Sequence, residues 1–332
     1  GGDALGAAPA ALVPEGPGGP EAYLRWLEKG MHGDMGYMAR SPETRSDIRR
    51  WFPQARSVVL CAWSYGEPTS AALPGEGRIA AYARSPDYHP RLRSLMKELL
   101  DWFCREASPG AAGRLFVDTS PVLERLYARQ AGLGWVGKNT LILSRRLGSM
   151  FLISGLAVDR DLAYDAPARD HCGSCDRCLR ACPTQAFPEP RVLDASRCVA
   201  YFTVEHRASP IPEGLRPGFG DWAFGCDDCQ TACPWTRFAG PPSVLKPTLP
   251  PSLPLEELSA LTPEEFDRRF KDTPLHRTGR AALLRNALLV MGNSRDPRWR
   301  PALEKHLSHE DPMVAEQAAW SLSRLPKGDA AI

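Results

Sequence analysis

Residues 172–183 read CGSCDRCLRACP and residues 226–234 read CDDCQTACP, so each stretch closes on a Cys-Pro pair. The first stretch has the spacing C-x2-C-x2-C-x3-C-P, which holds four-iron, four-sulfur clusters in bacterial ferredoxins. Cys198 lies between the two stretches and brings the set to eight cysteines. In proteins with two such clusters, the last cysteine of each run binds the cluster of the other run. The spacing therefore predicts a pair of interlocked iron–sulfur sites.

This rule divides the eight cysteines into two sets of four. The first cluster is predicted to bind Cys172, Cys175, Cys178 and Cys233, and the second Cys182, Cys198, Cys226 and Cys229. Structural zinc, which also takes four thiolates, is the alternative, but zinc modules rarely need interlocked positions with Cys-Pro closure. The other two cysteines, Cys61 in an apolar run and Cys104 in a helical one, are predicted to be core residues.

The composition of the 332-residue chain is that of a globular protein with room for two or three domains. The formal net charge is only +2, so the whole-chain charge argues neither for nor against a nucleic-acid partner. Clustered cysteines favour metal thiolates over disulfides, and such centres fit a reducing compartment. We therefore expect a cytoplasmic monomer, with no membrane partner because no apolar run reaches transmembrane length.

Three segments differ in their sequence pattern. Residues 1–165 alternate apolar runs with amphipathic ones, which favours an α/β domain with helices packed on an open sheet. Residues 166–240 hold the eight clustered cysteines but few apolar residues, so bound clusters are expected to organise them. Residues 241–332 continue from a Pro-rich stretch at 240–254, interpreted as a linker, into short paired helices that resemble a helical-repeat module.

The apolar periodicity predicts individual elements within these segments. The expected strands cover residues 57–63, 115–117, 140–143 and 150–158. The expected helices cover residues 21–29, 91–104, 121–132, 263–270, 278–291, 300–307 and 312–325.

Charge is uneven near the end of the chain. Residues 268–300 contain nine Lys and Arg residues against two acids, a surplus of seven positive charges. A surplus of this size is typical of a phosphate-binding surface and equally of a solvated helix face.

Asp118 ends an apolar strand within VDTSP at residues 117–121. A carboxylate at a strand end can face a pocket and act as a general acid if burial raises its pKa. An Asx turn or a helix cap before Pro121 is the more common role for such an aspartate. The residues alone leave both roles open.

Two further stretches favour a large ligand without defining it. Residues 132–140, GLGWVGKNT, contain glycines that allow close backbone approach, but they match neither a P-loop nor a dinucleotide fingerprint. Residues 82–89, YARSPDYH, share Asp-x-His with the start of a cobalamin-binding motif, yet Leu92 stands where that motif has glycine. We therefore do not predict His89 as an axial ligand. Ordinary surface loops are the alternative for both stretches.

Taken together, the chain resembles the epoxyqueuosine reductase family. The resemblance runs from about residue 24 to residue 325 and rests on the two cysteine runs and four segments in the same order: YARSPDYH at 82–89, VDTSPVLER at 117–125, GLGWVGKNTL at 132–141 and RNALLVMGN at 285–293. The family's usual opening strand is not evident in the first residues, so this edge of the first domain is expected to be incomplete.

The resemblance implies a three-part architecture and a reaction. Residues 1–165 would form an α/β domain that holds base-off cobalamin, residues 166–240 a ferredoxin-like domain with two 4Fe-4S clusters, and residues 241–332 a HEAT-like module that helps to hold tRNA. The implied activity is that of an oxidoreductase, which reduces epoxyqueuosine to queuosine at the tRNA wobble position with electrons from an external donor.

The resemblance also assigns roles to residues. Asp118 matches the family's proposed proton donor, and such an acid is expected in an apolar site that keeps it protonated near neutral pH. Lys138 and Asn139 match the cobalamin-contacting loop, with Tyr82, His89 and Arg125 as further candidates for that pocket. The residues expected to contact tRNA are Arg207, Arg277, Arg280, Arg285 and Asn286.

Two other functions share part of this pattern. A cobalamin-dependent reductive dehalogenase would use the same cofactors on a small halogenated molecule, but it has no need of a basic helical tail. A ferredoxin-type electron carrier has no use for a 165-residue α/β domain. The basic stretch at residues 268–300 favours tRNA, and a corrin spectrum would separate an enzyme from a carrier.

Overall fold

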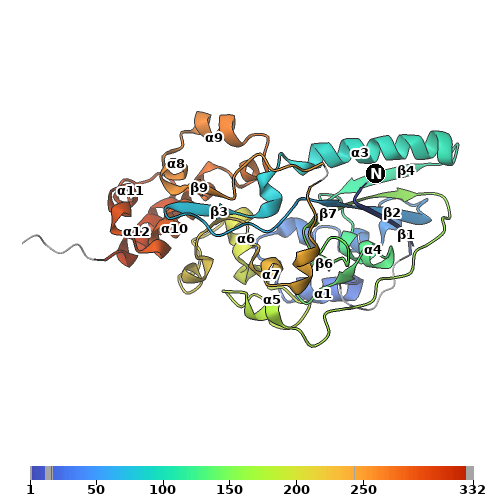
Figure 1. Ribbon diagram of the computed structural model, residues 1–332, viewed down its shortest axis with the longest axis horizontal. Coiled ribbons are helices and arrows are strands. Elements are labelled where there is room, and N and C mark those ends of the chain that lie inside the picture. Colours follow the sequence, from blue (N-terminus) through green and yellow to red (C-terminus); the bar gives the residue numbers. More distant parts are fainter. Residues whose placement is uncertain (1, 12–15, 17, 243, 327–332) are drawn as a thin grey trace, which may run out of the picture.

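The computed structural model describes residues 2–11, 16, 18–242 and 244–326. A sheet with its covering helices lies at one end of the molecule and the C-terminal helices at the other, with the cysteine-bearing segment between them (Figure 1). No helix in the described ranges combines the length and the apolar character needed to cross a membrane.

The main sheet has four strands in the order β1-β2-β7-β4, and every neighbouring pair is antiparallel. The strands are β1 (Ala4–Pro9), β2 (Ser57–Ser64), β7 (Phe151–Val158) and β4 (Gly113–Val117). The expected strands at 57–63, 115–117 and 150–158 are thus present. The expectation that the opening strand is missing was wrong: β1 pairs with β2 from Ala4 opposite Ala62 to Pro9 opposite Ser57. Its sequence, ALGAAP, contains no β-branched or aromatic residue to mark a strand.

Helices cover both faces of this sheet. Along β2, Leu60 faces the apolar cluster that includes α4 (Glu124–Gln130), whereas Trp63 faces the cluster that includes α3 (Tyr88–Trp102). This alternation follows from the two-residue period of a strand. Cys61 is a buried core residue, as predicted, and Cys104 is half-buried in the π-helical turn after α3.

A second sheet joins distant parts of the chain. It has the order β8-β3-β9, with β3 (Glu76–Ile79) parallel to β8 (Trp222–Phe224) and antiparallel to β9 (Ser252–Pro254). The end of the expected linker at 240–254 is therefore a strand. Short strands from three remote segments give no periodic signal, which is why the sequence did not reveal them.

The cysteine segment is supported by its neighbours. Its α-helices are short: α5 (Arg177–Arg180), α6 (Val199–Val204) and α7 (Asp228–Thr231). The N-terminal helices α1 (Pro20–Glu28) and α2 (Pro42–Ser46) lie before β2. Trp26 on α1 donates its Nε1–H to the Leu193 carbonyl over 2.6 Å, and the Ala195 N–H donates to the Met31 carbonyl over 2.9 Å. A hairpin of β5 (Trp135–Val136) and β6 (Ile142–Leu143) carries the glycine-rich loop.

The C-terminal helices are arranged around α10. They are α8 (Leu255–Ala260), α9 (Pro263–Phe270), α10 (Arg280–Ser294), α11 (Arg300–Glu304) and α12 (Pro312–Arg324). Nearly every residue from Ala282 to Gly292 is buried, including the polar Arg285 and Asn286. A helix that is buried on all sides forms the core of a module rather than its surface.

Gly155 gives a test of the main sheet's packing. A Cβ atom there would lie 2.3 Å from Cζ of Phe116 and 2.7 Å from the Val59 carbonyl oxygen. We expect Gly155→Ala to lower the free energy of unfolding by about 1–3 kcal/mol, because overpacking a well-filled core forces side chains out of place. Urea unfolding followed by circular dichroism measures the change.

The control is Gly214→Ala, because no atom lies within 4 Å of a Cβ at that position. Its effect should stay within about 0.5 kcal/mol. The double variant Gly155→Ala, Phe116→Leu should recover part of the loss. Equal stability of Gly155→Ala and the parent would contradict the described contact.

Candidate active site

Four of the eight clustered thiols enclose a small cavity of about 100 Å³. Its lining includes Cys172, Cys175, Cys178 and Cys233, the four residues predicted for the first cluster. Burial, and then the nearby Cys233 and Cys172 thiols, raise the pKa of the Cys178 thiol to about 11. Trp135 donates its Nε1–H to Sγ of Cys172 over 3.4 Å. The cysteines of the two runs therefore mix in space as the ferredoxin rule requires.

The other four thiols also lie near one another. Burial raises the pKa of Cys229 well above its usual value, and among the neighbouring groups that raise it further are Cys198 and Cys182. Cys198 and Cys226 pack in one apolar cluster with Trp26 of α1. Iron binds the thiolate form, so cluster assembly must release the protons that these raised pKa values retain.

The thiol geometry also bears on the zinc alternative. No three His, Cys, Asp or Glu side chains in the described part of the chain converge on a position for a single metal ion. A four-iron cluster needs no such convergence, because each of its cysteines binds a different iron atom.

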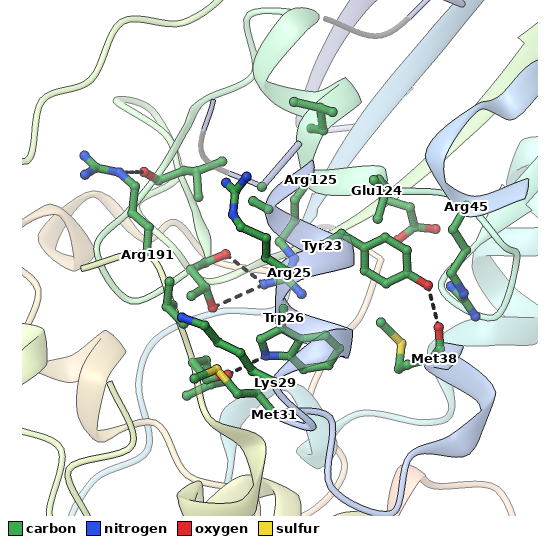
Figure 2. A pocket seen from close by; sticks show the side chains of 18 of the residues that line it. Tyr23, Arg25, Trp26, Lys29, Met31, Met38, Arg45, Glu124, Arg125 and Arg191 are labelled. Carbon is green, nitrogen blue, oxygen red and sulfur yellow. Dashed lines mark hydrogen bonds between the residues drawn. The ribbon is translucent and has the colours of Figure 1, made fainter. Parts of the chain in front are cut away.

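A larger cavity of about 390 Å³ lies beside the cysteine segment. Helix α1 forms one wall, and residues from the end of β4, from α4 and from the loop at 189–193 form the rest (Figure 2). The lining combines apolar side chains with several cations and includes Tyr23, Arg25, Trp26, Lys29, Met31, Met38, Arg45, Asp118, Val122, Glu124, Arg125, Thr140, Glu189, Arg191 and Leu193.

Most residues that line this cavity were not predicted from the sequence. Tyr23 donates its hydroxyl to the Met38 carbonyl over 2.5 Å, which ties α1 to the following loop (Figure 2). Arg191 donates Nε–H to the Val136 carbonyl over 3.3 Å. The helix at residues 21–29 was predicted from its apolar periodicity. That periodicity does not indicate that Trp26 lines a cavity and also contacts the cysteine segment.

Asp118 directly follows β4 with a φ of 50°, a left-handed conformation that is uncommon for residues other than glycine. Its backbone N–H donates to Oε1 of Glu124 over 2.7 Å. Its Oδ2 accepts from the Tyr88 hydroxyl at 3.1 Å and lies 3.1 Å from Nε2 of His89. Backbone strain held by such contacts is typical of functional sites.

The carboxyl group of Asp118 differs from the expected neutral acid. Burial raises its pKa, but the hydrogen bond and charge of His89, the Tyr88 hydroxyl and the Arg277 guanidinium outweigh burial, so the pKa is lower than usual. The expectation of an apolar site that keeps Asp118 protonated was therefore wrong. The side chain is half exposed toward the cavity, where it can meet a ligand.

His89 is the partner that can hold the proton. Its Nδ1 lies 2.7 Å from Oδ1 of Asp87, and its Nε2 lies 3.1 Å from both Asp118 Oδ2 and Arg277 Nη1. Burial lowers the pKa of His89, but the hydrogen bonds to Asp118 and Asp87 outweigh this and raise it above the usual value. Asp87 accepts the Nδ1 proton, so the transferable proton lies between Nε2 of His89 and Asp118.

Glu124 is a second acid in the same cavity. Burial and then the negative charge of Asp118 raise the pKa of Glu124 to about 8, although the Asp118 N–H partly offsets them. Glu124 is therefore largely protonated at neutral pH. Its spacing from Asp118 in VDTSPVLER was visible in the sequence, but its acid role was not predicted.

The other predicted cofactor contacts lie in different places. Lys138 donates Nζ–H to the Gly173 carbonyl over 2.7 Å, and the buried Asn139 donates to the Cys229 carbonyl over 3.4 Å. Both line the small cavity of the first cysteine set, so their placement favours support of the clusters. Arg125 lines the large cavity and donates to the Thr140 carbonyl over 2.8 Å. Tyr82 is half buried where three apolar clusters meet.

Two of the five predicted tRNA contacts need correction. Arg285 and Asn286 are each 1% exposed. Arg285 donates Nη1–H to the His206 carbonyl over 2.9 Å, and Asn286 Nδ2 donates to the carbonyls of Thr203 and Ala223 over 2.9 Å. Buried groups committed to backbone carbonyls cannot meet phosphates in solvent.

The other three predicted tRNA contacts are more accessible. Arg277 is half exposed beside Asp118 and His89, with Nη1 4.0 Å from Asp118 Oδ2. Arg207 is exposed, but it donates to the backbone carbonyls of Thr278, Glu205 and Val204. Arg280 lies 4.0 Å from Glu310.

Comparison with known proteins agrees with this geometry. The model of the 4Fe-4S double cluster binding domain matches residues 171–236, and the model described as epoxyqueuosine reductase QueG, DUF1730 matches residues 45–119. An epoxyqueuosine reductase of Pseudomonas aeruginosa is 42% identical over 318 residues, which cover 92% of this chain and 87% of that protein. The Escherichia coli epoxyqueuosine reductase is 37% identical over 90% of this chain and 80% of its own length.

Solved structures of the same family share the fold. An epoxyqueuosine reductase bound to an epoxyqueuosine-modified tRNA-Tyr stem loop superposes with a TM-score of 0.86 at 26% identity, covering 98% of this chain and 86% of that one. A Bacillus subtilis epoxyqueuosine reductase whose catalytic aspartate loop is swung out of the active site gives 0.84 at 26% identity, covering 98% and 87%.

A double 4Fe-4S domain beside a cavity with an acid–base cluster defines an iron–sulfur oxidoreductase. The identity and coverage of the relatives show which one: the chain belongs to the epoxyqueuosine reductase family. The family resemblance drawn from the sequence is thus confirmed.

The interlocked cysteine sets make a prediction about cluster loss. We expect Cys172→Ala and Cys233→Ala to lose the same cluster, although they lie in different runs, and Cys226→Ala to lose the other. Iron content and electron paramagnetic resonance of the reduced protein identify the cluster that remains. Cys104→Ala is the control and should keep both clusters. A Cys233→Ala spectrum identical to that of Cys226→Ala would contradict the assignment.

Proposed function

We propose that this chain reduces epoxyqueuosine to queuosine at the wobble position of tRNA. The observation that carries the proposal is a cavity that holds Asp118 and Glu124 on one side and borders the double-cluster segment through Trp26 on the other. Protons and electrons can therefore reach one ligand from two sides. The names of the relatives, and the stem loop bound to one of them, supply the substrate.

Cobalamin in its base-off form is the cofactor that we propose for the large cavity. The lining suits a flat, amide-edged macrocycle with a phosphate-bearing tail, because apolar Trp26 and Met31 lie beside the cations Arg25, Lys29 and Arg191. When bound, cobalamin would deliver electrons from the clusters to the epoxide carbon.

The reaction consumes two electrons and two protons. The carbon–oxygen bonds of the epoxide break, a carbon–carbon double bond forms, and the oxygen leaves as water. Protonated His89 would supply one proton to the departing oxygen through its hydrogen bond to Asp118, and Glu124 would supply the second. Proton transfer by positioned acids contributes about 10²–10⁴-fold to rates. Electrons come from an external donor through the two 4Fe-4S clusters.

The rest of the chain would hold the tRNA. We assign the C-terminal helices to a HEAT-like module, with residues 1–165, 166–240 and 241–332 as the cofactor, cluster and tRNA domains. Exposed cations in the basic stretch, Arg268, Lys271, Arg277, Arg295 and Arg298, are available for phosphates. A monomeric state and a cytoplasmic location complete the proposal, the latter because thiolate-held clusters suit a reducing compartment.

A single-turnover assay tests the activity. The protein is reconstituted with iron, sulfide and cobalamin without oxygen, then mixed with a chemical reductant and an epoxyqueuosine-containing stem loop. We expect cobalamin-dependent loss of one oxygen mass in the nucleoside mass spectrum. Intact clusters and bound corrin without conversion would contradict the proposal and direct attention to small-molecule substrates.

The proton pair makes a second prediction. Asp118→Asn and His89→Gln should each lower turnover by about 10²-fold or more while clusters and stem-loop binding stay intact. Because the protonated form of His89 is needed and its pKa is raised, wild-type activity should fall as pH rises above about 6.5, through that raised value. His89→Gln should lose the part of this decline that belongs to His89 and keep the decline near pH 8 that comes from Glu124. Asp101→Asn, an exposed carboxylate on α3, is the control. Unchanged turnover in Asp118→Asn would remove it from the mechanism.

A further inference from the structure

Glu205 is a carboxylate that the proposed chemistry does not use. It follows α6 directly and is half buried. Within the described ranges the Glu205 side chain makes no hydrogen bond or ion pair to another residue. In contrast, the carboxylates of Asp87 and Asp118 both lie within hydrogen-bond distance of His89. A half-buried carboxylate without a partner is costly unless a ligand satisfies it.

The backbone around Glu205 is held firmly. Its N–H donates to the Tyr201 carbonyl over 2.8 Å, and its carbonyl accepts from Nη1 of Arg207 over 3.1 Å. The neighbouring His206 lies 2.6 Å from Oδ2 of Asp34. The buried Asn286 binds the Thr203 carbonyl. The backbone that carries the carboxylate is therefore held in position before any ligand arrives, which favours a recognition role.

Hydrogen bonds connect Glu205 to the acid–base cluster. Arg207 also donates to the Thr278 carbonyl over 2.9 Å, and the adjacent Arg277 reaches Nε2 of His89 over 3.1 Å. Tyr37 is 41% exposed and interacts with the charges of Glu205, Asp118 and Arg277; we call the surface that these four residues share the mouth of the site. Burial, and then the charges of Glu205 and Asp118, raise the pKa of Tyr37 to about 12, so both carboxylates lie within electrostatic range of its hydroxyl.

The charge of Glu205 limits what can bind beside it. A carboxylate repels phosphate, so it does not serve the backbone of a nucleic acid. It accepts hydrogen bonds well, and a guanine-type base offers two adjacent donors, N1–H and the 2-amino group, on its Watson–Crick edge. Enzymes that act on a base extrude it from the stack and read that edge by hydrogen bonds.

We propose that Glu205 accepts hydrogen bonds from the Watson–Crick edge of the substrate's 7-deazaguanine base, with Tyr37 as a stacking surface beside it. This inference rests on the proposed function, because it assumes that the wobble base enters this mouth. In 7-deazaguanine the N1 and 2-amino edge lies across the ring system from C7, which carries the epoxide-bearing group. A base held by Glu205 would therefore direct that group away from Glu205, toward Asp118 and the cavity.

Stem loops with guanosine or inosine at the wobble position test the proposal without any reduction, because inosine lacks only the 2-amino group. Fluorescence anisotropy at one fixed salt concentration gives both dissociation constants. We expect the wild-type protein to bind the guanosine loop on the order of tenfold more tightly than the inosine loop. Glu205→Ala should bind the two loops equally, and Glu205→Gln, which keeps the side chain's shape, should lose most of the difference.

Glu304→Gln is the matched control, since Glu304 is exposed on α11 at the far end of the C-terminal helices (Figure 1). It should keep the wild-type ratio. Tyr37→Ala should weaken both loops about equally, because stacking does not distinguish the two bases.

Two results would overturn the inference: equal binding of both loops by the wild-type protein, or an unchanged ratio in both Glu205 variants. The proposed function is tested separately by the mass-spectrometric assay. Guanosine selectivity without epoxyqueuosine conversion would remove the proposed reaction but keep the base contact, and the reverse outcome would do the opposite.

Discussion

The carbonyl groups at the end of α6 must be satisfied away from water, and the rest of the site depends on how this is done. Buried Arg285 and Asn286 of α10 supply the donors, so the C-terminal helices and the cysteine segment are joined by hydrogen bonds in an apolar setting. Leaving such carbonyls unpaired costs about 1–3 kcal/mol each. These hydrogen bonds between α10 and the end of α6 also place Arg277, which precedes α10, beside His89 of the first segment. The place of Arg277 in the acid–base cluster thus depends on how the C-terminal helices pack on the other two parts of the chain.

Proton delivery in this arrangement depends on a pair of residues rather than on one raised pKa. An isolated aspartate in an apolar pocket would stay neutral but would have no source for a replacement proton. Here the pKa of Asp118 is lowered and that of His89 is raised, so the proton of their shared hydrogen bond resides on His89, and Asp118 is the ionised partner that holds it in place. Burial, and then the negative charge of Asp118, keep the nearby Glu124 protonated. Two proton donors with different pKa values, His89 and Glu124, therefore lie in one cluster.

Much of the fold could be predicted because local pattern determines it. The strand at 57–63 and the helix at 91–104 follow from apolar periodicity, and the cysteine sets follow from ferredoxin spacing. The opening strand escaped because small residues give no strand signal. Arg285 was placed on the surface because charge usually means exposure, yet its donors are needed inside.

The site was harder to predict than the fold. Asp118 could be recognised from its motif, but its pKa depends on Arg277, and the His89–Arg277 contact joins residues 188 positions apart. Only the folded chain brings such residues together. The wall formed by α1 was missed for a similar reason: Trp26 bonds a carbonyl 167 residues away.

The balance of charge at the mouth distinguishes Glu205 from its neighbours. Asp87 and Asp118 are negative groups with positive partners, because His89 lies between them and Arg277 lies close by. In the described part of the chain Glu205 makes no ion pair, although its charge acts on Arg277, and a site that admits a polyanion gains nothing from an extra negative charge. Glu205 is compatible with nucleic-acid binding if an uncharged base of the nucleic acid donates hydrogen bonds to its carboxylate. Phosphates would then position the nucleic acid, while this one acceptor would select the base.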